Sequence, residues 1–257
     1  MEQASGCSEN IVFYAGPGAP ESLISLVEGR LHCPVSRDVP PDGAHPVYLR
    51  GDGRGLALVG KECVLQGDFS GLLRRLTPNN LNGELIVRAV RFLQDPGPKV
   101  VVDATAGLGE DAFLLAAAGH RVILYERDPI IGLLLMDAMM RGQGDERLGE
   151  ILERMELRME DSITAMPGLT RSPDVVVLDP MFPQRQKSGL IKKKFQLLHL
   201  LEKPCGDEEA LLRAAMACSP RRIVVKRPAK GPYLAGRKPS YEIKGGSTRY
   251  DCIVCRG

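Results

Sequence analysis

The sequence has no apolar run approaching the roughly 18 residues that a membrane-spanning helix needs. Its first residues, MEQASGCSEN, lack the basic start and apolar stretch of a secretory signal. We therefore expect a cytoplasmic protein without a membrane partner. Histidine is also scarce: the four histidines are dispersed and pair with no obvious serine or cysteine nucleophile, so nothing supports a hydrolase triad.

Cysteine gives little sign of disulfides or of a metal. The seven cysteines are an odd number, scattered through a chain too long to need disulfide staples, which indicates reduced thiols. Cys252 and Cys255 have the spacing of metal ligands, but no second pair accompanies them and their residues alternate within a predicted strand. The sequence thus predicts no metal site.

The composition is that of a folded globular protein. Of 257 residues, 44% are hydrophobic and 26% are charged, which excludes disordered, collagen-like and coiled-coil proteins. The length suits one large domain or a main domain with a small appendage. The net charge of +2 hides an asymmetry, because residues 1–179 have a balance of −9 and residues 180–257 one of +11. A basic last third suggests a surface for a polyanion, although cations also solubilise ordinary surfaces.

Residues 1–75 are predicted to form a small N-terminal α+β domain, and residues 76–257 a second domain. Short apolar runs broken by turn signals characterise the first part, with a hairpin turning at Asp52-Gly53. A linker around Arg74–Asn82 precedes a predicted helix at Glu84–Leu93. The elements expected before it are a strand at Ile11–Ala15, a helix at Glu21–Gly29, the hairpin over Val47–Val59 and a strand at Cys63–Phe69.

From Lys99 onward, apolar strands alternate with helices, which is typical of a parallel α/β sheet with crossover helices. The predicted strands are Lys99–Asp103, Arg121–Glu126, Glu156–Met159, Asp174–Leu178 and Arg222–Lys226, with a closing antiparallel pair at Tyr241–Lys244 and Tyr250–Val254. The predicted helices are Asp111–Ala118, a helix from the N-cap Asp128 to about Met140, and one near Glu146–Met155.

A glycine loop follows the first of these strands, in the segment DATAGLGEDA. Gly107 and Gly109 let a ligand approach the backbone, and the helix N-terminus offers free N–H groups. We therefore predict that Asp103, Gly107 and Gly109 bind a cofactor. The loop also matches G-x-G-x-x-A, so a nicotinamide dinucleotide competes with other adenosine cofactors.

Acidic residues follow the next two strands. Glu126 ends the second strand, where a carboxylate can accept hydrogen bonds from both ribose hydroxyls of an adenosine-containing cofactor. Asp161 and Ser162 follow the third strand at the same edge of the sheet and could bind an adenine edge. They could equally cap the following helix.

The segment Asp179-Pro-Met-Phe-Pro directly follows the fourth strand and points to chemistry on an amine. An exocyclic amine on a base is a weak nucleophile because its lone pair is delocalised into the ring. Hydrogen bonds to the Asp179 carboxylate and the Pro180 carbonyl would stabilise the positive charge that grows as it attacks a methyl group. Phe182 would stack on the base. We predict these three residues to be catalytic.

Basic residues follow this loop and recur near the fifth strand. Cations that flank a base-binding loop would hold phosphates, supplying affinity rather than specificity. A solvated face is the alternative explanation. The residues we predict to contact nucleic acid are Arg185, Lys187, Lys192, Lys193, Lys194, Lys226 and Arg227.

With these motifs, the chain resembles a known family, ribosomal RNA small subunit methyltransferase J. The segments that carry the resemblance are DATAGLGEDAF, YERDP, EDSITAM, LDPMFPQRQKSGLIKKK and RIVVKRP, in this order and spacing. The resemblance is strong from about Lys99 to the end. It implies an α/β fold with a class I (Rossmann-like) methyltransferase sheet, and transfer of a methyl group from S-adenosylmethionine to N2 of a guanosine in 16S rRNA.

The resemblance also implies cofactor contacts, carried over residue by residue. These come from Glu110 and Asp111 after the glycine loop, Glu126 and Arg127, Asp161 and Ser162, and Asp179. Asp179 would then lie between the cofactor and the target amine. The chain departs from the family pattern in two places: Glu110 stands where arginine is expected, and Leu76–Asn82 replaces a glycine-rich stretch.

We therefore expect an S-adenosylmethionine-dependent enzyme acting on 16S rRNA or the small ribosomal subunit. Three alternatives stay open. The target amine could belong to another RNA or to DNA, since the amine-binding loop recognises chemistry more than sequence. The chain could be a non-catalytic ribosome-assembly protein that binds RNA, or it could be a dehydrogenase.

Overall fold

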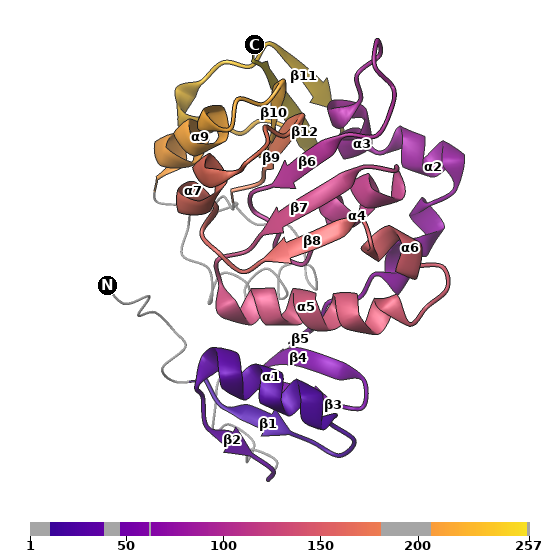
Figure 1. Cartoon of the computed structure of the whole chain (residues 1–257), viewed down its shortest axis with the longest axis vertical. Helices are drawn as coiled ribbons and strands as arrows, with labels where there is room; N and C mark the ends of the chain where they lie inside the picture. The colour runs from indigo at the N-terminus through magenta and orange to yellow at the C-terminus, as the bar shows by residue number, and fades with distance from the viewer. Residues whose placement is uncertain (1–10, 39–46, 62, 181–206, 256–257) are drawn as a thin grey trace. The chain divides into compact units, whose positions relative to one another are not determined.

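The computed structural model describes residues 11–38, 47–61, 63–180 and 207–255, which fall into two compact units (Figure 1). The first unit comprises the described residues up to Asp68 together with Asp128–Arg141. The second comprises Phe69–Arg127 and the described residues from Gly142 onward. The boundary at residues 75 and 76 stays a prediction.

The first unit is built on a five-stranded sheet in the order β2-β1-β3-β4-β5. Its strands and first helix are β1 (Phe13–Ala15), α1 (Glu21–Leu31), β2 (Val35–Ser36), β3 (Val47–Asp52), β4 (Gly55–Gly60) and β5 (Val64–Leu65). β1 is parallel to both of its neighbours, whereas β3, β4 and β5 pair antiparallel. The Asp52 carboxylate accepts a hydrogen bond from the Arg54 backbone N–H at 2.8 Å, which closes the predicted hairpin turn.

Helix α5 (Pro129–Gln143) lies mainly in the first unit. As predicted, Asp128 caps it, because its Oδ1 accepts hydrogen bonds from the N–H groups of Ile130 and Ile131 at 2.9 and 3.0 Å. Farther along, the buried Asp137 carboxylate accepts from the Leu56 backbone N–H at 3.0 Å. This bond anchors α5 on β4.

The backbone at Gly67 lies close against α5. A Cβ at this position would lie 2.7 Å from the Cβ of Ala138 and 2.9 Å from the Leu134 carbonyl oxygen. Because helix backbone cannot yield easily, we expect Gly67→Ala to lower the free energy of unfolding by about 1–3 kcal/mol in urea titrations. The matched control is Gly29→Ala on α1, where a Cβ meets nothing within 4 Å. Equal effects of the two variants would contradict the tight contact.

The second unit is built on a seven-stranded sheet in the order β11-β12-β10-β9-β6-β7-β8. The strands from β10 to β8 are parallel, and β12 and β11 add the antiparallel edge that the sequence predicted. The strands are β6 (Val100–Asp103), β7 (Arg121–Tyr125), β8 (Met155–Arg158), β9 (Val175–Leu178), β10 (Arg222–Pro228), β11 (Tyr241–Lys244) and β12 (Thr248–Val254). The helices are η2 (Ser70–Arg75), α2 (Pro78–Gly83), α3 (Leu85–Val90), α4 (Glu110–Ala117), α6 (Gly149–Leu152), α7 (Ser162–Ala165), η3 (Met166–Gly168), α9 (Glu208–Ala217) and η4 (Leu234–Gly236).

The core of this unit forms because its central strands are apolar on both faces. Every side chain of β9 is buried, as expected for a parallel strand covered on two sides. On one face, Val176 and Val225 pack against Leu211 and Ala215 of α9 and Met166 of η3. This packing fixes the carboxyl ends of the strands relative to one another.

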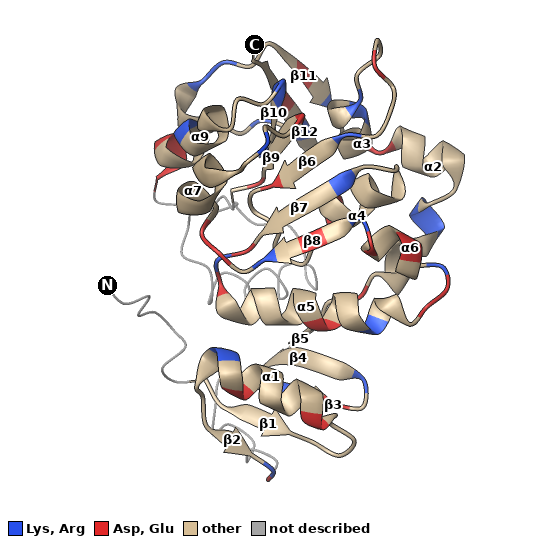
Figure 2. Ribbon diagram, in the orientation of Figure 1, with Lys and Arg blue, Asp and Glu red and all other residues tan. Residues whose placement is uncertain are grey.

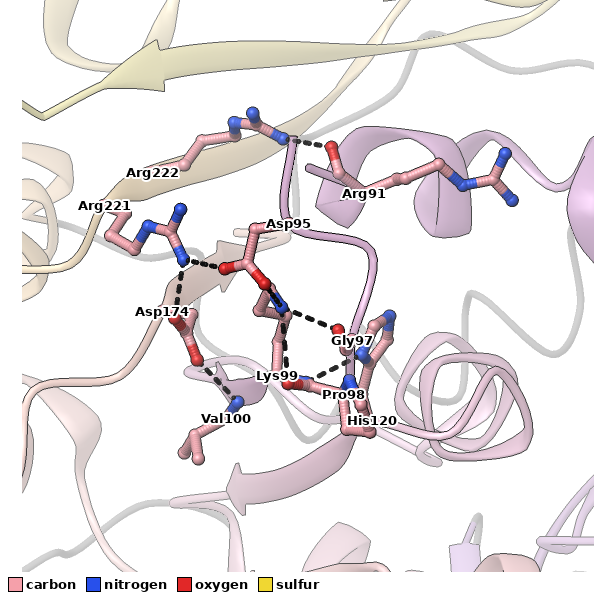
Figure 3. A network of polar contacts seen from close by, with 10 residues as sticks. All are labelled: Arg91, Asp95, Gly97, Pro98, Lys99, Val100, His120, Asp174, Arg221 and Arg222. Carbon is pink, nitrogen blue, oxygen red and sulfur yellow. Dashed lines mark hydrogen bonds and ion pairs between the residues drawn. The ribbon is translucent and has the colours of Figure 1, made fainter. Parts of the chain in front are cut away.

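A network of polar contacts joins residues at the amino ends of β6, β9 and β10 (Figure 3). Arg221 contacts the carboxylates of Asp95 at 2.7 Å and Asp174 at 3.2 Å. Asp174 also accepts a hydrogen bond from the Val100 backbone N–H at 2.9 Å, and the buried Lys99 pairs with Asp95 at 3.0 Å. These contacts stabilise the amino ends of the strands, whereas Asp103 lies at their carboxyl ends.

Three parts of the second unit differ from the sequence prediction. The linker around Arg74–Asn82 contains η2 and α2, and Pro78 occupies the first turn of α2, where a missing N–H costs nothing. The helix near Glu146–Met155 is wrong in extent, since only Gly149–Leu152 is helical. Helix α9 was missed, although Asp207 caps it by accepting from the Ala210 N–H at 2.6 Å.

Among the described residues, none of the helices combines the length and the apolar character needed to cross a bilayer.

Candidate active site

The candidate active site lies where the strand order of the second unit reverses. From β6, the chain continues to β7 on one side, whereas β9 lies on the other. In open α/β sheets, ligands bind beyond the carboxyl ends of the strands at such a switch point. Asp103 is the last residue of β6, and Asp179 is the first residue after β9. Asp103 and Asp179, both predicted to belong to the site, are 76 positions apart in the sequence. They lie at the ends of neighbouring strands.

The glycine loop has the conformation that its glycines permit. Gly107 and Gly109 have φ angles of +55° and +76°, a region that other residues rarely adopt. A Cβ at Gly107 would meet nothing within 4 Å, so there is open space beside it. The Gly107 N–H donates to Glu126 Oε2 at 2.9 Å. The predicted loop and the predicted acid are thus joined by a hydrogen bond.

Asp179 is held by residues from several elements. Its backbone N–H donates to Thr105 Oγ1 at 2.6 Å. Its Oδ2 lies 2.9 Å from Lys226 Nζ, and the same ammonium lies 2.9 Å from Oδ2 of Asp111. The Tyr250 hydroxyl donates to that Asp111 oxygen at 3.2 Å. The segments directly after β6 and β9, strands β10 and β12 and helix α4 all contribute to this cluster.

Negative charge exceeds positive charge within this cluster. Burial, together with smaller effects of the nearby carboxylates of Asp111 and Asp179, raises the pKa of Asp103 to about 7. Partial burial also raises the pKa of Asp179, against the opposing effect of Lys226. Burial alone would lower the pKa of Lys226, but the two aspartates outweigh it and raise the pKa. A site of this kind favours a cationic ligand.

The raised pKa of Asp103 has a consequence for stability. An aspartate in an unfolded chain has a pKa of about 3.9, so between about pH 4 and about pH 7 the folded chain binds the extra proton. The free energy of unfolding contributed by Asp103 therefore falls as the pH rises through this window. Asp103→Asn removes the titration, so its stability relative to wild type should increase with pH in urea unfolding from about pH 5 to about pH 8. A difference independent of pH would contradict the assignment.

Comparisons with known proteins decide between the cofactors that the glycine loop leaves open. Residues 61–255 match the family model described as "Putative SAM-dependent methyltransferase". The chain is 36% identical over 242 residues to ribosomal RNA small subunit methyltransferase J of Neisseria meningitidis serogroup C, covering 93% of this chain and 95% of the relative. The chain belongs to the ribosomal RNA small subunit methyltransferase J family.

Other members of the methyltransferase J family and a solved structure agree. The relative from Thioalkalivibrio sulfidiphilus is 43% identical over 215 residues, 81% of this chain and 84% of its own. The relative from Pseudomonas savastanoi pv. phaseolicola is 46% identical over 170 residues, 66% of this chain and 63% of its own. The crystal structure of a SAM-dependent methyltransferase from Neisseria gonorrhoeae superposes with a TM-score of 0.76 at 30% identity, covering 96% of each chain. The predicted class I methyltransferase fold is confirmed.

S-adenosylmethionine is the cofactor of the methyltransferase J family, and the residues present fit it. Its sulfonium and ammonium groups are cationic, which matches the surplus of carboxylates from Asp103, Asp111 and Asp179. The open space beside Gly107 allows a ligand to approach the backbone. The dehydrogenase alternative is therefore wrong.

The remaining predicted cofactor residues lie at the same edge of the sheet or close to it. Asp161 Oδ1 accepts a hydrogen bond from the Ile163 N–H at 2.9 Å, so the alternative reading as a helix cap is correct for this oxygen. Ser162 is buried at the start of α7. Glu110 and Arg127 are exposed, the first on α4 and the second just after Glu126. Their contacts with the cofactor stay predictions.

One residue predicted to bind RNA does not present its charge to solvent. The Arg227 side chain is fully buried and pairs with Glu208 of α9 at 3.3 Å, so we assign it a structural role. Figure 2 shows both signs of charge on α9, whose first turn holds Glu208 and Glu209. Lys226 faces the site instead. The predicted residues Phe182, Arg185, Lys187, Lys192, Lys193 and Lys194 lie outside the described residues.

Two side chains of this cluster, Thr105 and Tyr250, were not predicted from the sequence. Thr105 lies within the glycine-loop segment, directly after β6. Its position in the sequence could therefore have predicted a contact with the end of the neighbouring strand β9. Tyr250 lies on β12, 139 residues from Asp111, and no local pattern marks it. Only the pairing of β12 with β10 brings it to the site.

Proposed function

We propose that this chain transfers the methyl group of S-adenosylmethionine to N2 of a specific guanosine in 16S rRNA, with the small ribosomal subunit in the cytoplasm as its partner. The observation that carries the proposal is the position of Asp179, directly after β9 beside the glycine loop and followed by Pro180. The names of its relatives, ribosomal RNA small subunit methyltransferases, support the choice of RNA.

The residues that would hold the cofactor surround the glycine loop. Glu126 would accept hydrogen bonds from the ribose hydroxyls, and Asp161 and Ser162 would contact the adenine edge. Asp103 and Asp111 would favour the cationic end of the molecule. When bound, S-adenosylmethionine supplies an electrophilic methyl group on a positively charged sulfur.

Asp179 and Pro180 act on the amine. Their carboxylate and carbonyl oxygens would accept the two N–H groups of guanine N2, which aims the nitrogen lone pair and stabilises the charge that develops during attack. A nitrogen that has gained a methyl group is cationic and acidic, so its proton leaves readily. The Asp179 carboxylate, whose pKa burial raises, is placed to accept this proton and return it to water. Phe182 would stack on the base.

The test is transfer of labelled methyl from S-adenosylmethionine to small ribosomal subunits that lack the modification, followed by nucleoside analysis. We expect N2-methylguanosine in 16S rRNA. Parallel reactions with naked 16S rRNA, other RNA and duplex DNA separate the alternatives by substrate. Label in another nucleoside, or only in DNA, would overturn the substrate assignment. Tight cofactor binding without transfer to any nucleic acid would favour the non-catalytic alternative.

A further inference from the structure

Lys226 connects the glycine-loop side of the site to the loop that carries Asp179. Its Nζ lies 2.9 Å from an oxygen of Asp179 and 2.9 Å from an oxygen of Asp111. We propose that Lys226 is a positioning residue for methyl transfer: it holds the Asp179 carboxylate ionised and oriented toward the target amine, and is itself braced by Asp111 and Tyr250. The role in transfer rests on the proposed function, whereas the coupling of Lys226 to Asp179 does not.

The brace is assembled from three separate elements. Lys226 on β10 pairs directly opposite Tyr250 on β12, so both side chains emerge on the same face of the sheet. Both reach Oδ2 of Asp111, at the start of α4. Tyr250 is only 4% exposed, which gives its hydroxyl little freedom to move away. The ammonium is therefore fixed in front of Asp179 rather than free to swing into solvent.

Among the charged groups near Asp179, Lys226 has the largest effect in keeping its carboxylate ionised. Asp111 from α4 raises the pKa of Asp179, and Asp103 from β6 is a further acidic group whose own pKa is raised to about 7. The Tyr250 hydroxyl from β12 stays protonated, because burial and Asp111 raise its pKa. Arg227 from β10 opposes them from a distance, but its side chain pairs with Glu208. Lys226 is in direct contact and lowers the pKa of Asp179. Without it, Asp179 would face the Asp111 carboxylate with no ammonium group between them.

The coupling is tested by titrating Asp179 itself. Protein labelled with carboxyl-¹³C aspartate gives its pKa by NMR, with the signal assigned from Asp179→Asn. We expect the pKa of Asp179 to rise by about one unit or more in Lys226→Met, and to stay within about 0.3 units of wild type in Lys226→Arg. Lys230→Met, at an exposed lysine four residues later, is the matched control. An unchanged pKa in folded Lys226→Met would overturn the proposal, and Lys226→Gln gives the same test if the methionine variant does not fold.

The role in transfer is tested by kinetics on the same variants. We expect kcat of Lys226→Met to fall about tenfold or more while KM for the RNA changes less than about twofold, with Lys226→Arg recovering most of kcat. A merely structural role would raise KM or lower stability without moving the acid limb of the pH profile, and that outcome would overturn the proposal. If wild type methylates no rRNA, the proposed function fails, whereas the titration still decides the coupling.

Discussion

Replacing Asp179 by alanine should reduce kcat for methyl transfer about 100-fold or more while the protein still folds. The variant removes the carboxylate that accepts the N–H groups of the target amine. Its backbone N–H can still donate to Thr105, and Lys226 keeps its ion pair with Asp111. Single-turnover transfer to small ribosomal subunits measures the loss.

Two controls separate chemistry from structure in this variant. Thermal unfolding should be close to wild type, because the Asp179 side chain is 41% exposed and packs no core. Asp179→Asn keeps one acceptor oxygen but no charge, so its loss of kcat should be smaller than that of Asp179→Ala. Wild-type turnover by the alanine variant would rule out the catalytic assignment.

Replacing Asp251 by alanine should lower the free energy of unfolding by about 3 kcal/mol or more. Asp251 on β12 is 2% exposed, and its carboxylate accepts two hydrogen bonds from Arg249, from Nε at 2.8 Å and from Nη2 at 3.1 Å. The variant leaves a buried guanidinium whose nearest remaining carboxylate oxygen, on Glu242, is 3.9 Å away. Urea and thermal unfolding measure the effect.

The matched control for Asp251 is an exposed pair of the same chemistry. Glu209 and Arg213 on α9 pair at 3.4 Å with side chains 74% and 67% exposed. Water and salt screen such a pair, so Glu209→Ala should change stability by only about 0.5 kcal/mol or less. Similar effects of the two variants would show that burial does not strengthen the Arg249 pair.

The central sheet and the edge that carries the site could be predicted from sequence. Parallel strands covered on both faces read as unbroken apolar runs, and KVVVD and DVVVL accordingly predicted β6 and β9 to within a residue at each end. Strands of a parallel sheet end at one edge, so placing Asp103, Glu126 and Asp179 together needed no tertiary information. A short amphipathic helix such as α9 has a weaker sequence pattern than a buried parallel strand, and it was not predicted.

The contacts of Lys226 and Arg227 could not be predicted by counting charges along the chain. Both were assigned to one basic surface, but successive residues of a strand point to opposite faces of the sheet. Lys226 points toward α4 and meets Asp111, whereas Arg227 points toward α9 and meets Glu208. The partner of each side chain therefore depends on which helix covers that face of the sheet.

The first unit is discontinuous in sequence, and this restricts how the protein can evolve. The peptide that carries Glu126 and Arg127 runs without a linker into α5, whose Asp137 is anchored on Leu56 of β4. A gene fragment that ended near residue 70 would lack this helix, and one that began there would leave the Asp137 carboxylate without its backbone donor. A recombination point near residue 70 would therefore separate β4 from the helix that is hydrogen-bonded to it, so the N-terminal residues do not make up an exchangeable module by themselves.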